Sequence, residues 1–200
     1  MKIESFDFSK NKETYIVAEL SANHNQDFKT AIDTIKAAKE IGCNAVKIQT
    51  YTPDTITIDC NKKDFLIKGT IWGGDSLYSL YKKAYTPWEW HKELFDVAKK
   101  TGITLFSTPF DKSSVDFLEK LNTPAYKIAS FEITDIPLIK YIAQKNKPII
   151  LSTGIAEKQD IDLAVSTILD QGNDKIILLQ CTSSYPSPLD QANLKLIDQL

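Results

Sequence analysis

The sequence predicts an α/β fold of parallel strands, a (β/α)8 (TIM) barrel of which only the first six βα units are present in 200 residues. Short apolar runs of strand length alternate with longer amphipathic stretches, which is the pattern of consecutive βα units. The runs are apolar at successive positions, as in parallel strands that helices cover on both faces. Polar residues follow nearly every run. This favours a barrel over a doubly wound open sheet, in which the chemistry gathers at one switch point.

Six apolar runs, rich in Val, Ile, Leu and aromatic residues, are predicted to form the strands. They are Tyr15–Leu20, Ala45–Thr50, Thr104–Pro109, Ala125–Ser130, Pro148–Thr153 and Lys175–Cys181. No low-complexity segment or interdomain linker separates them, so we expect one domain over residues 1–200.

The helices are predicted from apolar residues spaced three and four apart and from their capping residues. One helix follows the first strand from Phe28 and stops at Gly42, and another runs from Trp88 to Gly102. The later helices are predicted with Asp111 or Ser113 before Ser114–Leu121, Asp135 before Ile136–Gln144, and Asp160 before Ile161–Gln171.

The segment from Tyr51 to Tyr85 interrupts the alternation of predicted strands and helices. It places about three dozen residues between the second strand and its helix, and loops of that length inside compact domains are functional or disordered. The aromatic residues Tyr78, Tyr81 and Tyr85 argue against disorder. We therefore predict a wall or lid on the substrate side of the barrel.

The composition excludes several classes of protein. With 24 Lys and Arg against 26 Asp and Glu, neither sign of charge dominates, which argues against a nucleic-acid or membrane surface. The longest apolar runs fall far short of the roughly 20 residues of a membrane helix. The N-terminus shows no secretory signal, and the three cysteines have no paired spacing. These features predict a cytoplasmic protein with reduced thiols, with Cys43 and Cys181 as small buried hydrophobes.

The polar residues at the strand ends are the candidates for a site, because the carboxyl ends of barrel strands converge on one pocket. Two lysines, several hydroxyl groups and a glycine turn suit a small anion such as phosphate or carboxylate. Two glutamates add acid–base groups. The candidates are Glu19, Ser21, Asn23, His24, Asn25, Lys47, Gln49, Ser107, Thr108, Lys127, Ser130, Glu132, Ser152, Thr153, Gly154, Gln180, Thr182, Ser183 and Tyr185.

Each candidate also has a structural interpretation. Lys47 and Lys127 lie inside apolar strands, where an unpaired ammonium is costly, so either ligand contact or a buried ion pair accounts for them. Glu19 is then a substrate contact or the partner of one lysine. His24 suits either a functional role or a hydrogen bond to the backbone, and His91 is expected to pack or to face solvent. A lysine at a strand end also permits Schiff-base chemistry, and position alone does not separate the two mechanisms.

The strand-end motifs resemble those of the sialic-acid-type synthases. Ile16–Gln26 resembles the opening motif of that family, and its Glu-Leu-Ser-Ala-Asn-His-Asn-Gln form resembles the pseudaminic acid branch. The resemblance runs collinearly over nearly the whole chain. The further matching motifs are Lys47–Thr50, Ile67–Gly74, Ala84–Trp90, Phe106–Asp111, Tyr126–Thr134, Leu151–Gly154 and Cys181–Pro186. Gln180 stands where sialate synthases tend to carry His, which weighs against sialic acid as the product. At Ser183 sialate synthases carry Asn, a departure that bears on the contact expected of Ser183.

The resemblance implies roles for particular residues. The phosphoenolpyruvate site would comprise Lys47, Thr108, Lys127, Ser130, Ser152, Ser183 and Tyr185. The sugar side would use Asn23 and Gln49, with Glu19 and Glu132 as catalytic carboxylates. No metal ligand is expected within these residues. A divalent metal, Mn²⁺ or Mg²⁺, is implied as cofactor, with its ligands beyond residue 200.

The resemblance also implies a reaction, the condensation of phosphoenolpyruvate with 2,4-diacetamido-2,4,6-trideoxy-L-altrose to give pseudaminic acid and phosphate. This sialic-acid-type carbohydrate biosynthesis would serve flagellin glycosylation, and the full-length protein would be a homodimer. The last two βα units and an antifreeze-like (SAF) C-terminal domain are expected to be missing, so the 200-residue chain would be inactive and poorly soluble. The alternatives are an N-acetylneuraminate or legionaminate synthase, a Schiff-base aldolase or lyase, and an inactive anion-binding fragment.

Overall fold

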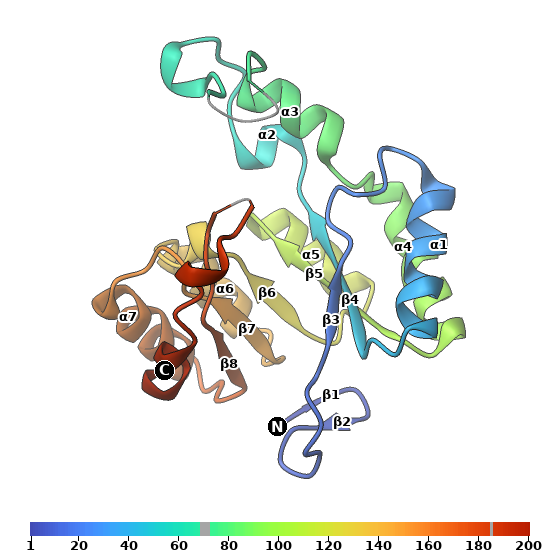
Figure 1. Ribbon diagram of the computed structural model, residues 1–200, viewed down its shortest axis with the longest axis vertical. Helices are drawn as coiled ribbons and strands as arrows, with labels where there is room; N and C mark the ends of the chain where they lie inside the picture. Colours follow the sequence, from blue (N-terminus) through green and yellow to red (C-terminus); the bar gives the residue numbers. More distant parts are fainter. Residues whose placement is uncertain (69–72, 185) are drawn as a thin grey trace. The chain divides into compact units, whose positions relative to one another are not determined.

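The computed structural model describes residues 1–68, 73–184 and 186–200. By its internal contacts the chain divides into two compact units. Unit 1 comprises Met1–Lys12 and Pro124–Leu200, and unit 2 comprises Glu13–Thr123. Figure 1 shows the strands and helices of both units. Within the described ranges, no helix has both the length and the apolar character needed to cross a membrane.

Unit 2 contains three parallel strands that pair in chain order. The order is the one that successive βα units of a barrel adopt. The central strand and its later neighbour are largely buried, as predicted for parallel strands under helices. The three strands are β3 (Val17–Glu19), β4 (Ala45–Thr50) and β5 (Thr104–Pro109).

Strand β3 is shorter than the predicted strand Tyr15–Leu20. At its start the side chain of Asn44 accepts a hydrogen bond from the Ile16 N–H, in place of a backbone partner. After Leu20 the backbone turns at Ser21, whose φ of 42° lies in the left-handed region. The predicted hydrophobic run is therefore longer than β3, because a side-chain hydrogen bond at Ile16 and a turn at Ser21 limit the strand.

The three helices predicted in unit 2 begin and end close to the predicted residues. Asp27 caps the first helix by accepting a hydrogen bond from the Lys29 N–H. Asp111, and not Ser113, caps the third, and Gly102 ends the second with a φ of 73°. The three helices are α1 (Phe28–Glu40), α4 (Trp88–Thr101) and α5 (Lys112–Lys120).

The core of unit 2 forms where α1 and α4 pack side by side against the sheet (Figure 1). Ile35 of α1, Val46 of β4 and Leu94 of α4 are each 0% exposed. Because strand side chains alternate between faces, Val46 and Ile48 in this core direct Lys47 toward the opposite face. Packing of the apolar face therefore decides where the lysine lies.

The chain between β4 and α4, residues 51–87, is here called the β4–α4 excursion. It leaves from the carboxyl end of β4 (Figure 1), the end at which barrels carry their chemistry. Residues Gly69–Trp72, part of the motif Ile67–Gly74, lie outside the described residues. The described part forms α2 (Pro53–Ile56), a 3-10 turn η1 (Lys63–Phe65) and α3 (Leu77–Ala84).

Unit 1 also contains three parallel strands in chain order, together with an N-terminal hairpin that the sequence pattern did not predict. The hairpin strands have only two residues each, too short to show a period. The parallel strands are β6 (Tyr126–Ile128), β7 (Ile149–Ser152) and β8 (Ile176–Leu179), and the hairpin is β1 (Lys2–Ile3) and β2 (Phe6–Asp7).

The helices of unit 1 pack against each other and bury Ile139, Ile142 and Ile168. Asp135 caps the first helix as predicted. The second begins earlier than predicted, because Glu157 is its N-cap and Asp160 is the third helical residue of a capping box. The helical elements are α6 (Ile136–Ala143), α7 (Lys158–Leu169) and the 3-10 segments η2 (Ser130–Glu132), η3 (Leu189–Gln191) and η4 (Leu194–Gln199).

Candidate active site

In unit 2, Lys47 joins three strands at their polar ends. Its Nζ lies 2.6 Å from Oε2 of Glu19 and donates a hydrogen bond to Oγ1 of Thr108 at 3.2 Å. The lysine side chain is 12% exposed, whereas the glutamate side chain is 46% exposed. Thr108 is buried. The sheet register sets this cluster, because Glu19 pairs with Lys47. The lysine side chain is therefore held in place between the carboxylate and the hydroxyl group.

The two residues predicted for the sugar side lie close to this cluster. Gln49 is half-buried, two residues beyond Lys47 on the same face of β4, and is in register with Thr108. Asn23 is exposed in the β3–α1 loop, and its Nδ2 lies 3.5 Å from the Glu19 carbonyl oxygen. Ser21 donates a hydrogen bond to the Glu19 carboxylate. Glu19 is thus the partner of both Lys47 and Ser21, and its side chain remains 46% exposed.

In unit 1, Lys127 is the centre of a second cluster. It is 7% exposed, and its Nζ donates to Oγ of Ser152 at 2.5 Å and to the Ile128 carbonyl oxygen at 2.7 Å. Cys181 Sγ donates to the same Ser152 Oγ at 3.3 Å. The sequence analysis treated Cys181 as a small buried hydrophobe. That interpretation was wrong, because the thiol is half-buried and bonded to a site hydroxyl.

The turn after β7 brings Ser130 and Ser183 close to Gly154. The Gly154 N–H donates a hydrogen bond to Ser130 Oγ at 3.2 Å. A Cβ on Gly154 would overlap Ser183 Oγ and would lie 3.0 Å from Cys181 Cβ and from its carbonyl oxygen. Only glycine fits between these groups, so the loop after β8 can approach the turn after β7.

Glu132 is the second predicted catalytic carboxylate. It lies in η2, and among the described residues its buried Oε2 has no hydrogen-bond partner. Burial raises the pKa of the Glu132 carboxyl above its ordinary value, and the positive charge of Lys127 opposes this only in part. An acid of this kind retains its proton to higher pH than a solvated glutamate, which suits it to proton transfer.

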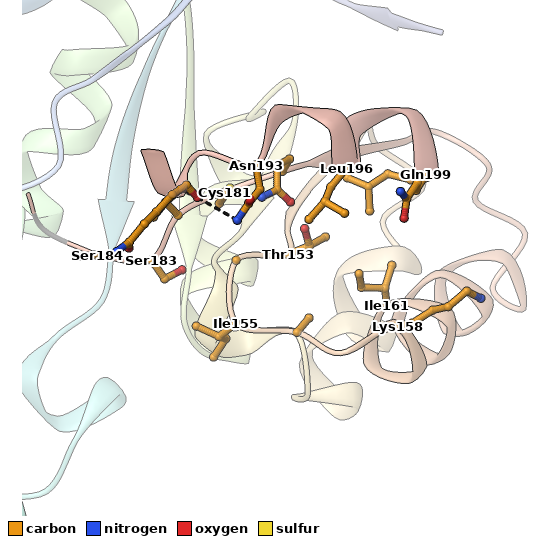
Figure 2. Close-up of a pocket in the computed structure, with 16 residues that line it drawn as sticks. Thr153, Ile155, Lys158, Ile161, Cys181, Ser183, Ser184, Asn193, Leu196 and Gln199 are labelled. Atoms are coloured by element: carbon orange, nitrogen blue, oxygen red, sulfur yellow. Dashed lines mark hydrogen bonds between the residues drawn. The ribbon is translucent and has the colours of Figure 1, made fainter. Parts of the chain in front are cut away.

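A pocket of about 700 Å³ lies at the carboxyl ends of β7 and β8, beside the turn that contains Gly154. Figure 2 shows Thr153 and Ile155 after β7, Cys181, Ser183 and Ser184 after β8, and Asn193, Leu196 and Gln199 of the last turns around it. The predicted site residues of unit 1 that line it are Thr153, Gly154, Gln180, Thr182 and Ser183, whereas Lys127, Ser130, Glu132 and Ser152 do not. Tyr185 lies outside the described residues.

Both histidines are buried, and their ring nitrogens form hydrogen bonds within unit 2. His24 is 0% exposed and bonds to Oγ1 of Thr86 at 3.2 Å. His91, expected to pack or to face solvent, is also 0% exposed and bonds to Thr50 Oγ1 at 2.9 Å and to the Pro87 carbonyl at 3.1 Å. Burial lowers the pKa of both imidazoles, that of His91 to about 4. The described residues include no group of three or more His, Cys, Asp or Glu placed to bind a metal.

Comparison with known proteins identifies the family. The NeuB family matches residues 34–200, which is most of the chain. The chain belongs to the NeuB family. Two relatives named pseudaminic acid synthase are similar to this NeuB-family chain: that of Campylobacter jejuni is 45% identical over 188 residues, and that of Helicobacter pylori is 50% identical over 179 residues. These matches cover 94% and 90% of the chain.

A solved NeuB-type structure supports the fold. The N-acetylneuraminic acid synthetase of Leptospira borgpetersenii superposes with a TM-score of 0.82 at 30% identity. The superposition covers 94% of this chain and 61% of that structure. The chain spans about half the length of the curated relatives it matches, 55% and 53% of their sequences. The similarity therefore supports a partial barrel.

The structure brings together some predicted residues of this NeuB-family chain and adds others. Glu19, Lys47 and Thr108 touch in unit 2, and Lys127 and Ser152 touch in unit 1. Two residues were not among the predicted candidates: Gln26, which bonds to the end of the excursion, and Thr86, which bonds to His24. A strand-end pattern does not identify them, because their partners lie on loops distant in the sequence.

Proposed function

We propose that the protein is a transferase that condenses phosphoenolpyruvate with 2,4-diacetamido-2,4,6-trideoxy-L-altrose to give pseudaminic acid and phosphate. One observation carries the proposal: two hydroxyl-bonded lysines lie in strands of a chain that is 45–50% identical to curated pseudaminic acid synthases. Sets of ammonium and hydroxyl groups favour a ligand with phosphate and carboxylate oxygens.

The bonding of the lysines favours a cationic role over Schiff-base formation. A nucleophilic amine must be neutral and must present its lone pair. Lys47 is paired with a carboxylate, and Lys127 donates to a hydroxyl and to a carbonyl oxygen, so both nitrogens are engaged as donors to oxygen atoms. Both lysines are therefore proposed to balance the charges of phosphoenolpyruvate, together with Thr108, Ser130, Ser152, Ser183 and Tyr185.

The proposed reaction balances without a redox step. The C3 carbon of phosphoenolpyruvate forms a bond to the aldehyde carbon, and the aldehyde oxygen takes up a proton. Water adds to C2, and the C2–O bond to phosphate breaks, so that inorganic phosphate leaves. Glu132, whose carboxyl has a raised pKa, is the residue proposed to take the proton of that water, and Glu19 orients Lys47.

A divalent metal, Mn²⁺ or Mg²⁺, also belongs to the proposal. The described residues do not themselves fit a metal: they hold no group of three or more ligating side chains, and Glu132 offers one unbonded carboxylate oxygen. No step is therefore assigned to a metal here. If the protein is a metalloenzyme, chelation with EDTA abolishes phosphate release, and Mn²⁺ or Mg²⁺ restores it.

A second candidate is a NeuB-type synthase for another nonulosonic acid, N-acetylneuraminic or legionaminic acid. The structural match to an N-acetylneuraminic acid synthetase favours this candidate. Its chemistry at phosphoenolpyruvate would be the same as that of the first candidate. The position of Gln180, and the excursion motifs around Lys68 and Thr86, favour pseudaminic acid. A cytoplasmic homodimer that supplies sugar for flagellin glycosylation is part of the same proposal.

The test is phosphate release from phosphoenolpyruvate with a panel of aldehyde sugars, on the protein in the form in which the cell makes it. The expected result is turnover with 2,4-diacetamido-2,4,6-trideoxy-L-altrose and little with N-acetylmannosamine. Turnover with N-acetylmannosamine alone would establish the second candidate. No phosphate release with any sugar would reject both.

A further inference from the structure

The ring of His24 uses both of its nitrogens inside unit 2. The Gln26 backbone N–H donates to Nδ1 at 3.1 Å, so Nδ1 carries no proton. Nε2 therefore carries the proton and donates to Thr86 Oγ1 at 3.2 Å. The ring is 0% exposed and meets Trp90 edge-on, and Thr86 is 1% exposed. A histidine bonded in this way has no nitrogen left for a metal or for proton transfer.

The neighbouring Gln26 holds the end of α3. Its Nε2 donates to the carbonyl oxygens of Lys83 at 3.1 Å and Tyr85 at 2.5 Å, where a helix end leaves acceptors without intrahelical partners. Gln26 has a φ of 57°, in the left-handed region that a glutamine rarely adopts unless its surroundings impose it. The β3–α1 loop is therefore shaped to present His24 and Gln26 to the excursion.

The two ends of the β4–α4 excursion are tied to each other as well. Trp88 Nε1 donates to the Tyr51 carbonyl oxygen at 3.1 Å. The Tyr51 ring, 3% exposed, packs edge-on against Tyr81 of α3 and Phe110 after β5. Tyr51 lies two residues after Gln49 and contacts Tyr81, so the position of the aromatic part of the excursion depends on where α3 is held.

We propose that His24, Gln26 and Thr86 are positioning residues that hold α3 and its aromatic side chains in place to recognise the amino-sugar substrate. These three residues are called the His24 clasp. The clasp joins the loop that carries Asn23 to the end of the excursion, 57 to 62 residues later in the chain. This inference rests on the proposed function for the substrate, while the clasp itself rests on the hydrogen bonds of unit 2.

Paired variants separate the hydrogen bonds from the packing. Thr86→Val removes the hydroxyl at nearly constant volume, and Thr86→Ser restores it. His24→Gln retains a donor for Thr86, and His24→Asn retains an acceptor for the Gln26 N–H. Gln26→Glu removes the donor at constant shape. Thr34→Val is the matched control, because its hydroxyl bonds only within α1, to the Thr30 carbonyl.

Two measurements decide the inference, both on the protein in the form in which the cell makes it. Amide hydrogen exchange over residues 77–86 should speed up about tenfold in Thr86→Val and Gln26→Glu, and return to the original rate in Thr86→Ser. The KM for the aldehyde sugar should rise about tenfold in the same variants, while the KM for phosphoenolpyruvate changes less than about twofold. Thr34→Val should change neither quantity.

The outcomes distinguish the clasp from the proposed reaction. Unchanged exchange in Thr86→Val and Gln26→Glu would overturn the clasp, whatever the enzyme activity. Faster exchange with an equal rise of both KM values, or with no rise, would overturn its role in sugar recognition. If the unmodified protein releases no phosphate with any sugar, the proposed function fails, and the substrate part of the inference fails with it.

Discussion

Lys47 Nζ lies 2.6 Å from Glu19 Oε2, yet the two side chains differ in exposure, 12% against 46%. Removal of the lysine leaves a carboxylate that water can solvate. Removal of the glutamate leaves a largely buried ammonium with less compensation. The consequences of breaking the pair therefore depend on which partner is changed.

Lys47→Met is expected to raise the KM for phosphoenolpyruvate about 10- to 100-fold, since a charge-assisted hydrogen bond contributes about 1.5–3 kcal/mol. Glu19→Gln is expected to lower the free energy of unfolding by about 1–3 kcal/mol, because the buried ammonium loses its counter-charge. Urea unfolding and steady-state kinetics measure the two effects. Lys92→Ala, which breaks an exposed pair with Asp96, is the control and should change neither. A stable Glu19→Gln variant would contradict the structural role of Glu19.

Lys127 is expected to bind phosphoenolpyruvate as an ammonium group. Lys127→Met should weaken phosphoenolpyruvate binding at least about 100-fold, because Ser152 loses its charged donor within a buried cluster. Calorimetry with phosphoenolpyruvate measures the affinity. In parallel, borohydride treatment with pyruvate should leave the protein mass unchanged. A reduced adduct at Lys127 or Lys47 would replace the cationic role by Schiff-base chemistry.

Gly154→Ala is expected to destabilise unit 1 by about 1–3 kcal/mol, since the added methyl group overlaps Ser183 and crowds Cys181. Ser183→Ala in the same chain should recover part of the loss, because it removes the overlapping Oγ. The Cys181 contacts at 3.0 Å remain, so recovery should stay incomplete. Thermal unfolding of both single variants and the double variant gives the coupling. Strictly additive effects would show that Gly154 and Ser183 do not meet in solution.

Glu132→Gln is expected to abolish most phosphate release while it stabilises the protein at neutral pH. The folded-state pKa of Glu132 is raised by burial, so the carboxyl contributes its full stability only below its unfolded pKa. That contribution is lost as pH rises through the folded pKa. The variant should therefore have the higher melting temperature at pH 8, and the difference should shrink toward pH 4. A difference that grows toward acid pH would mean that Glu132 is stabilised as a carboxylate.

His91 is expected to make stability depend on pH in mildly acid solution. Its pKa is about 4 in the folded protein, chiefly through burial, against an ordinary value of 6.5. Its contribution is complete above pH 6.5 and is lost as pH falls toward 4, because the unfolded chain then binds a proton that the folded chain cannot. The loss amounts to about 3 kcal/mol. His91→Gln does not titrate and should flatten this part of the urea-unfolding profile. An unchanged slope would assign the dependence to other groups.

The strands and helices were largely predictable, because each depends on local periodicity and caps. The predicted α7 began too late because Asp160 resembles an N-cap, and only the bond from the Glu157 N–H shows that it is the third residue of a capping box. The hairpin at Lys2–Asp7 was missed since two-residue strands carry no period. The excursion was correctly singled out by its length, but its helices α2 and α3 were not predicted.

For the candidate site, the sequence determined which strand ends carry charge and hydroxyl groups. It could not determine the partners. The pairing of Glu19 with Lys47 depends on sheet register, and the bond of Lys127 to Ser152 joins residues 25 positions apart.

By itself the sequence determined the α/β class, the polar strand ends and the resemblance to sialic-acid-type synthases, since these depend on spacing along the chain. Only the tertiary structure decided the state of the groups that those positions carry. Burial raised the pKa of Glu132, and a hydrogen bond to Thr86 across 62 residues fixed the buried ring of His24. Burial and hydrogen bonding depend on residues that are distant in the sequence. The spacing of residues along the chain therefore could not predict the pKa of Glu132 or the partner of His24.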